Sequence, residues 1–168
     1  MTVEAITTFI RVFDSNNTET HRFQNSNTSS EVTYAPDQAS CFDGSTASLS
    51  YPYLPFVYNG ATKSITGDNI ESTLTFEATA LTLANAHEAV ENFHGIEVMT
   101  VLMAPDTFVQ NRSLTSECWI ITGMNYSVDG VQLRLSTAID AVSASVPNQV
   151  LRSEVVGALP VSSRINNA

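Results

Sequence analysis

The sequence predicts a mainly β fold, an antiparallel β-barrel or sandwich with one short helix, from three observations. Uncharged polar residues are abundant, with 19 Ser, 19 Thr and 13 Asn, whereas only 14% of residues are charged. Helix surfaces usually carry more charge, while Thr and the β-branched and aromatic residues suit pleated strands. Several segments alternate apolar and polar residues with the period of two that a strand requires. Turn-forming residues separate these segments.

Length and composition predict one domain with a substantial core. A chain of 168 residues buries roughly 70% of its unfolded surface, and an apolar share of 43% excludes wholesale disorder. We expect a single β-rich domain over residues 1–146, with a polar loop at 14–31, and a C-terminal arm over 147–168. No stretch approaches the ~20 apolar residues that span a bilayer, and no signal peptide is visible, so we expect no membrane insertion.

The N-terminal third predicts short strands joined by turns. Residues 6–13 alternate, with apolar side chains on both faces, which indicates a strand covered on both sides. A turn follows at 14–17, and short strands are expected around 21–23 and 32–34. Prolines then exclude a central strand at 51–56, which we expect to be extended and to lay aromatic rings on the core.

The middle of the chain predicts strands at 63–66 and 70–78 and one helix at about 84–94. Apolar residues in that helix recur at helical spacing. Asn85 is the expected N-cap, and Gly95 suits the C-terminal cap.

The last third predicts a central strand followed by a hairpin. Residues 96–104 are apolar on both faces, which is typical of a strand inside a sheet. Residues 105–116 are expected to be a loop. The pair Asp129-Gly130 lies between the alternating runs 118–126 and 131–135, a strong hairpin signal.

Two cysteines, Cys41 and Cys118, lie 77 positions apart and include no CxxC motif. They do not make a zinc site by themselves. We expect two buried free thiols, with a disulfide as the alternative.

No catalytic, metal-binding or cofactor-binding residue is predicted. His87 and His94 could share a helix face, but seven residues is ~10 Å of rise, too far for a usual two-histidine metal pair. The third histidine, His21, has no partner in the sequence pattern. Glu71 and Glu77 lie ~20 Å apart on one strand face, too far for a glycosidase pair. No phosphate-binding glycine motif and no GxSxG motif is present.

The charge balance argues against nucleic-acid and anionic-membrane partners. The net charge is −10, and Lys63 is the single lysine. Proteins that grip nucleic acid neutralise several phosphates with Lys and Arg, which seven scattered cations do not provide.

From about residue 51 to 165, the order of features resembles the minor tail protein L family, the tail-hub or tail-tip proteins of lambda-like long-tailed bacteriophages. The similar features are a Tyr/Pro-rich entry to the sheet, a Thr/Leu-rich strand before a short helical crossover, a strand ending in Asp before a loop, and a last hairpin. They correspond to residues 51–56, 72–77, 98–108 and 119–137. A closing Pro-then-Arg feature is matched by Pro160 and Arg164.

The resemblance implies a structural virion protein with a β-barrel core similar to that of tail-tube proteins. It implies a homo-oligomeric ring of three or six copies at the distal end of the tail, between the tail tube or distal tail protein and the hub, spike or fibre-bearing protein. The protein would be made in the host cytoplasm, and the genome would pass an acidic lumen. Many members carry a cysteine-rich C-terminal extension that Cys41 and Cys118 do not match, so no metal or iron–sulfur cluster is implied.

Besides an enzyme of unrecognised type, for which no motif speaks, two other functions stay open from the sequence. One is a different virion protein of the tube, neck or capsid decoration. The other is a carbohydrate-binding β-sandwich, since aromatic rings can stack on sugars; the candidate rings are Tyr51, Tyr53, Tyr58 and Trp119.

Overall fold

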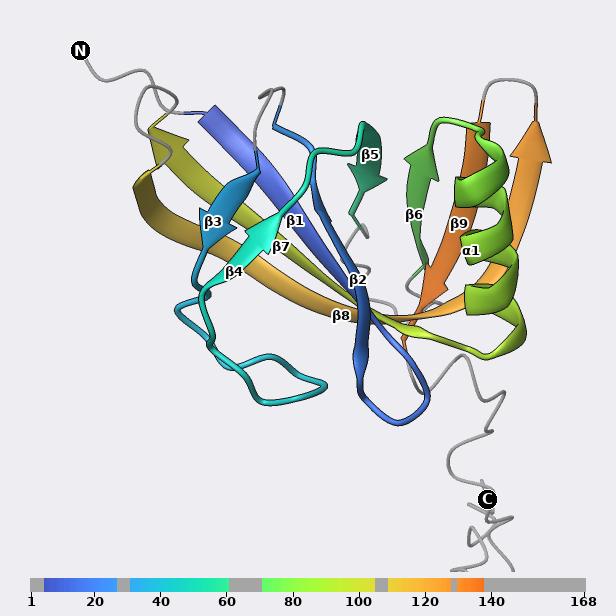
Figure 1. Ribbon diagram of the computed structural model, residues 1–168, viewed down its shortest axis with the longest axis horizontal. Helices are drawn as coiled ribbons and strands as arrows, with labels where there is room; N and C mark the ends of the chain where they lie inside the picture. Colours follow the sequence, from blue (N-terminus) through green and yellow to red (C-terminus); the bar gives the residue numbers. More distant parts are fainter. Residues whose placement is uncertain (1–4, 27–30, 61–70, 105–108, 128–129, 138–168) are drawn as a thin grey trace, which may run out of the picture.

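The computed structural model describes residues 5–26, 31–60, 71–104, 109–127 and 130–137 and shows a mainly β fold with one helix in this part of the chain (Figure 1). The elements are β1 (Ala5–Phe13), β2 (Glu19–Gln24), β3 (Val32–Tyr34), β4 (Leu49–Tyr51), β5 (Phe56–Asn59), β6 (Glu71–Phe76), α1 (Ala80–Glu91), β7 (Gly95–Ala104), β8 (Val109–Ser127) and β9 (Gly130–Ser136).

Seven strands form one antiparallel sheet in the order β2-β1-β7-β8-β9-β6-β5, and β3 and β4 form a separate ribbon. The long strand β8 joins the two halves of the sheet. Its first part pairs with β7 and its last part with β9, and Ile120 is paired on both sides, with Gly95 and with Ser136. Figure 1 shows β8 crossing the molecule beneath both groups of strands.

The described strands leave the sheet open, so the sandwich-like form is present and the closed barrel is not. β2 and β5 are its two edges. The edges approach each other just before β5, where the Gln24 amide donates to the Pro52 carbonyl and the Leu54 amide donates to the Gln24 carbonyl. Pro52 itself has no N–H to donate, so the contact remains a single bridge between Gln24 and Tyr53.

The expectation that β1 and β7 are covered on both faces is confirmed. On one face, the β3–β4 ribbon covers Phe9 and Met99, and the Phe9 ring stacks on Tyr34. On the other face, Ile10 and Val98 belong to a second core that includes residues of α1, β8 and β9. These two clusters make β1 and β7 the interior strands that their apolar pattern predicts.

The helix begins earlier than predicted and uses a different cap. Thr79 is the N-cap: its side chain accepts from the Thr82 amide, and the Thr82 side chain accepts from the Thr79 amide, which is a capping box. Asn85 lies inside the helix. The helix ends at Glu91, its C-cap is Asn92 rather than a glycine, and Phe93 takes a positive φ of 49°. Gly95, the predicted cap, begins β7.

Two boundaries in the last third also differ from the prediction. Strand β8 begins at Val109, within the predicted loop 105–116, because β7 pairs with it along its whole length. Leu114 and the residues after it up to Ser116 are exposed, which explains their polar, loop-like pattern. The predicted hairpin is confirmed, with Ser127 paired with Gly130. The predicted strand at 63–66 and the arm 147–168 lie outside the described residues.

The polar loop predicted at 14–31 is only partly a loop. Its first residues make the predicted turn, closed by hydrogen bonds between Asp14 and Thr18, and Asn17 takes a positive φ of 60°. Strand β2 follows inside the segment and pairs with β1, as the short strand expected around 21–23 suggested.

Candidate functional sites: a disulfide-anchored polar row and an apolar pocket

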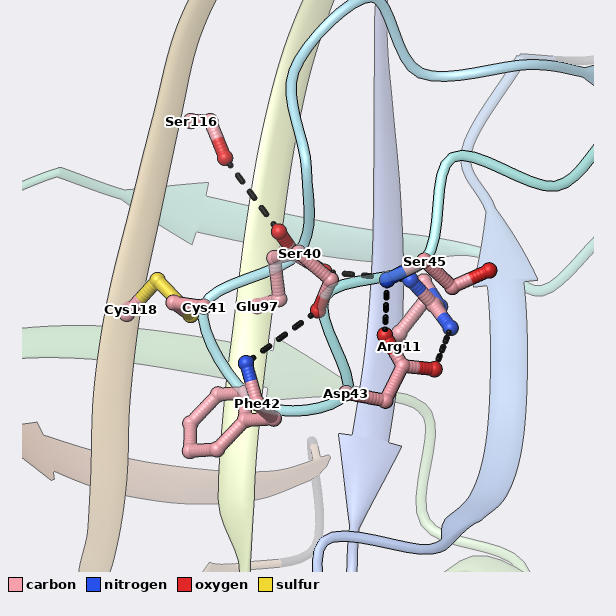
Figure 2. Close-up of a disulfide and its surroundings, with 9 residues drawn as sticks. All are labelled: Arg11, Ser40, Cys41, Phe42, Asp43, Ser45, Glu97, Ser116 and Cys118. Atoms are coloured by element: carbon pink, nitrogen blue, oxygen red, sulfur yellow. Dashed lines mark hydrogen bonds and ion pairs between the residues drawn. A yellow bond between two sulfur atoms is a disulfide. The ribbon is translucent and has the colours of Figure 1, made fainter.

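A row of polar side chains crosses three neighbouring strands on the sheet face that the β3–β4 connection covers. Arg11 of β1 lies opposite Glu97 of β7, and Glu97 lies opposite Cys118 of β8. Directly opposed residues of antiparallel strands point to the same face, so the pairing register places the three side chains side by side. Figure 2 shows them beneath the loop that carries Cys41, Phe42 and Asp43.

Three consecutive loop residues each hold a different part of this row. Cys41 forms a disulfide with Cys118, with Cα atoms 6.6 Å apart. Phe42 stacks on Phe13, and its ring covers Gly95. Asp43 accepts a hydrogen bond from Nη2 of Arg11 at 2.7 Å. The loop is thus fixed by one covalent bond, one ring contact and one ion pair.

The expectation of two buried free thiols is wrong. Cys41 and Cys118 are exposed and bonded to each other. The sequence does not reveal this because the partner of Cys118 depends on where β8 sits against β7 and on how the loop returns over the sheet. Separation along the chain contains neither piece of information.

Arg11 is the charged centre of the row. Its side chain is 2% exposed, with Nε 2.5 Å from Glu19, Nη2 2.7 Å from Asp43 and Nη1 3.4 Å from Glu97. Burial alone would lower the pKa of Arg11, but the hydrogen bond that Arg11 donates to Glu19 and the negative charges of Glu19 and Asp43 raise it. The guanidinium also lies over the Phe13 ring, 4.8 Å from its centroid.

The carboxylate of Asp43 is held in its charged form by its contacts. Burial would raise the pKa of Asp43, but the hydrogen bond from the Ser45 amide and the nearby charge of Arg11 lower it overall. Glu19 has a second partner, Arg22, whose Nε lies 2.6 Å away. Ser116 donates to Glu97 at 3.4 Å. This arrangement is a compensated ion cluster that ties β1, β2, β7 and the loop together.

The row also contains atoms of the kind that bind soft metals. The sulfur atoms of Cys41 and Cys118 and a carboxylate oxygen of Glu97 all lie within 4.8 Å of one another. The two sulfur atoms are bonded to each other in the disulfide, so neither is a thiolate ligand. Glu97 already faces the Arg11 guanidinium, which repels a cation. Metal binding is therefore not the chemistry that this geometry favours.

A second candidate site is a mainly apolar pocket of about 210 Å³ between α1 and the sheet. Its walls come from β1, β2, α1, β8 and β9; among them are Ile10, Phe23, Leu81, Ala86, Ile121 and Leu133. A few polar groups lie at its edge. Asn85 and His21 are hydrogen-bonded across the gap between α1 and β2, 3.3 Å apart, and Glu88 also lines the pocket.

The structure separates the two histidines that the sequence could pair and brings a different pair to one site. His87 is exposed on α1 and lies 3.2 Å from Glu91. His94 follows the helix, is 7% exposed and lines the pocket. His21 of β2 lines the same pocket. Sequence spacing does not predict that His21 and His94 line the same pocket. His94 comes just before β7, and β7 is not adjacent to β2 in the sheet.

The aromatic and acidic candidates do not form sites. Tyr51 and Trp119 are buried core residues. The Tyr58 hydroxyl donates to Glu117, and burial followed by this contact raises the pKa of Tyr58. Tyr53 alone of the four rings is widely exposed. Glu71 is paired with Arg134 at 3.1 Å on the surface of the sheet.

No family model matches the sequence, and no curated protein is significantly similar to it. In the part of the chain that the structure describes, α1 is too short to cross a membrane, and no other helix is a candidate.

Proposed function

We propose that this protein is a structural subunit of a bacteriophage tail, part of the ring at the hub or tip that connects the distal end of the tail tube to the central spike or fibre-bearing protein. The observation that carries the proposal is the ordered resemblance of residues 51–165 to the minor tail protein L family. The mainly β fold of the described residues supports the β-rich character that the family implies, while their open sheet differs from the family's β-barrel core.

The charge distribution supports a subunit that DNA passes without binding. Each arginine side chain that the structure describes is paired with carboxylates: Arg11 with three of them, Arg22 with Glu19, and Arg134 with Glu71. Cations engaged in this way are poor ligands for phosphate, and the net charge of −10 repels it. An acidic ring lumen follows from the proposal. A ring structure with its acidic side chains turned outward and a neutral or basic axis would contradict it.

A carbohydrate-binding module is the alternative of a different class, and the described residues do not favour it. Two of its four candidate rings, Tyr51 and Trp119, are in the core, where they cannot stack on a sugar. The ion cluster at Arg11 does not offer a sugar-binding site either, because its three carboxylates are already paired with the Arg11 guanidinium.

Immunogold electron microscopy of phage particles with an antibody against this protein tests the proposal. Gold at the distal end of the tail is the expected result. Gold on the tube, neck or head would keep a virion function and exclude the hub. Absence of label on intact and disrupted particles would exclude both, and binding to a glycan array would then favour the carbohydrate-binding alternative.

A further inference from the structure

The apolar pocket between α1 and the sheet has a lining that suits an apolar side chain. Its walls are largely aliphatic and aromatic, and Leu81 stands at its rim with 70% of its surface exposed. An exposed leucine beside an unfilled apolar cavity is unfavourable in water, and such patches commonly mark sites where another chain binds.

The C-terminal arm is rich in the aliphatic residues that an apolar pocket binds. Residues 147–168 contain an apolar stretch within 150–161, whose members are Val150, Leu151, Val155, Val156, Ala158, Leu159, Pro160 and Val161. The arm has no clear helical or strand period, so its apolar residues are not assigned to the core of the domain by their pattern.

The charges of the two surfaces are complementary. Helix α1 carries Glu88 at the pocket and Glu91 one turn further on, and it contains no Lys or Arg. The arm carries Arg152 and Arg164 against Glu154 alone, in a chain that is otherwise strongly acidic. The excess of one positive side chain on the arm favours its encounter with the acidic end of the helix.

The connection that precedes the arm is long enough to reach the pocket of a neighbouring copy. Strand β9 ends at Ser136, which pairs with Ile120, and the next residue of β8, Ile121, lines the pocket of the same chain. A short connection would therefore reach that pocket. The connection is residues 138–149, which extended span ~40 Å, about the diameter of a small domain.

We propose that the pocket of one subunit receives the apolar stretch 150–161 of a second copy of this chain. The contact joins two different surfaces, the pocket and the arm, and when it is repeated head to tail with a rotation that closes, it produces a ring. The inference rests on the proposed function in that it names the contact that would build the ring. It is nevertheless testable without phage particles.

Site-specific photocrosslinking in the full-length chain tests this contact. A benzophenone amino acid replaces Leu81, and light and isotopically heavy chains are mixed at the highest soluble concentration before irradiation. Mass spectrometry then identifies each crosslinked pair. We expect products that join position 81 of one chain to residues 150–161 of the other isotopic form. The matched control places the same label at Tyr126, which is similarly exposed but does not line the pocket.

A second substitution links the product to burial of the arm. In the labelled chain, Leu151→Asp should lower the yield of the product about tenfold or more, because an unpaired carboxylate would have to leave water to enter the pocket. Crosslinks confined to single chains, crosslinks to other segments, or equal yields from positions 81 and 126 would each overturn the inference. If immunogold labels the distal tail while this product is absent, the pocket contact fails and the hub proposal stands; the product without distal label gives the reverse.

Discussion

The buried guanidinium of Arg11 is the residue on which the polar row depends. Its substitution by Met would leave the carboxylate of Glu97, itself 2% exposed, without its cation. We expect Arg11→Met to lower the free energy of unfolding by about 3–5 kcal/mol, since a buried charge that loses its partner is strongly destabilising. Urea unfolding under non-reducing conditions measures this effect.

Arg134→Met provides the matched control. It breaks an ion pair between the same residue types, but the Arg134 and Glu71 side chains are about half exposed. The free energy of unfolding should change by no more than ~1 kcal/mol, as is usual for surface pairs. Similar losses in the two variants would show that the Arg11 cluster is not buried as described.

Asp43 gives the cluster a dependence on pH. Because the folded state lowers the pKa of Asp43, this group stabilises the fold above its unfolded pKa, and that contribution is lost as the pH falls through the folded value. The stability difference between wild type and Asp43→Asn should be largest near neutral pH and should shrink below 3.8, the ordinary aspartate value. Thermal unfolding of both proteins from pH 7 to pH 2.5 gives the comparison; a constant difference would contradict it. The pKa of Asp14 is also lowered, but Asp14 is common to both proteins.

Gly95 must be a glycine because of a side chain from the loop. A Cβ at this position would lie 2.3 Å from Cε1 of Phe42, whose ring is held against Phe13. We expect Gly95→Ala to destabilise the protein by about 1–3 kcal/mol through overpacking. Adding Phe42→Leu should restore part of the loss. Gly123→Ala is the control, since the nearest atom there is 3.8 Å away. Chemical denaturation of the three variants would refute the overpacking explanation if Gly123→Ala proved equally harmful.

At the scale of single residues, the sequence predicts which strand faces are buried but not which side chains meet across strands. The alternation of 70–78 is confirmed by buried Ser72 and Leu74. The meeting of Arg11, Glu97 and Cys118 depends on pairing register, which is decided by long-range packing and is absent from any local pattern. The same reason explains why His21 and His94 were not expected to share a pocket.

At the scale of elements, the disulfide between Cys41 and Cys118 attaches the loop that joins β3 and β4 to strand β8. The double substitution Cys41→Ser, Cys118→Ser should lower the free energy of unfolding by about 2–4 kcal/mol, because the disulfide closes a segment of 77 residues in the unfolded chain. Hydrogen exchange should also become faster at the amides of Ser40 and Gly44, which bond within the loop. A reductant should reproduce both effects in the wild type and have none in the double variant. Persistence of slow exchange after reduction would show that the ion pair and ring contact are sufficient.

The elements that the sequence predicts well are those specified by local chemistry. The Asp129-Gly130 hairpin, the Asp14 turn and the apolar strand β7 all follow from turn residues or alternation within a few positions. The start of β8 was missed because residues 109–116 become a strand only through their pairing with β7. The start of α1 was missed because two threonines, Thr79 and Thr82, cap it reciprocally where an asparagine was expected.

For the whole molecule, assembly should be separable from folding. Deletion of residues 150–168 leaves every described strand and the helix intact, so we expect a monomer with unchanged circular dichroism and thermal midpoint. The same deletion should abolish the oligomer in sedimentation analysis, because it removes the proposed occupant of the pocket. Loss of folding would instead assign residues 150–168 to the core of their own domain, and an intact oligomer would place the ring contact elsewhere.

Under the proposed function, the redox state of Cys41 and Cys118 would differ between the inside of the host cell and the released particle. A bacterial cytoplasm keeps thiols reduced, so subunits assembled there would carry Cys41 and Cys118 as thiols. Both cysteines are exposed residues, and the bond would form once the particle meets an oxidising exterior. The loop over Arg11 would then be held noncovalently before host lysis and covalently after it. Trapping free thiols by alkylation in infected cells and in released particles would distinguish the two states. We expect free thiols in the cells and the disulfide in the released particles.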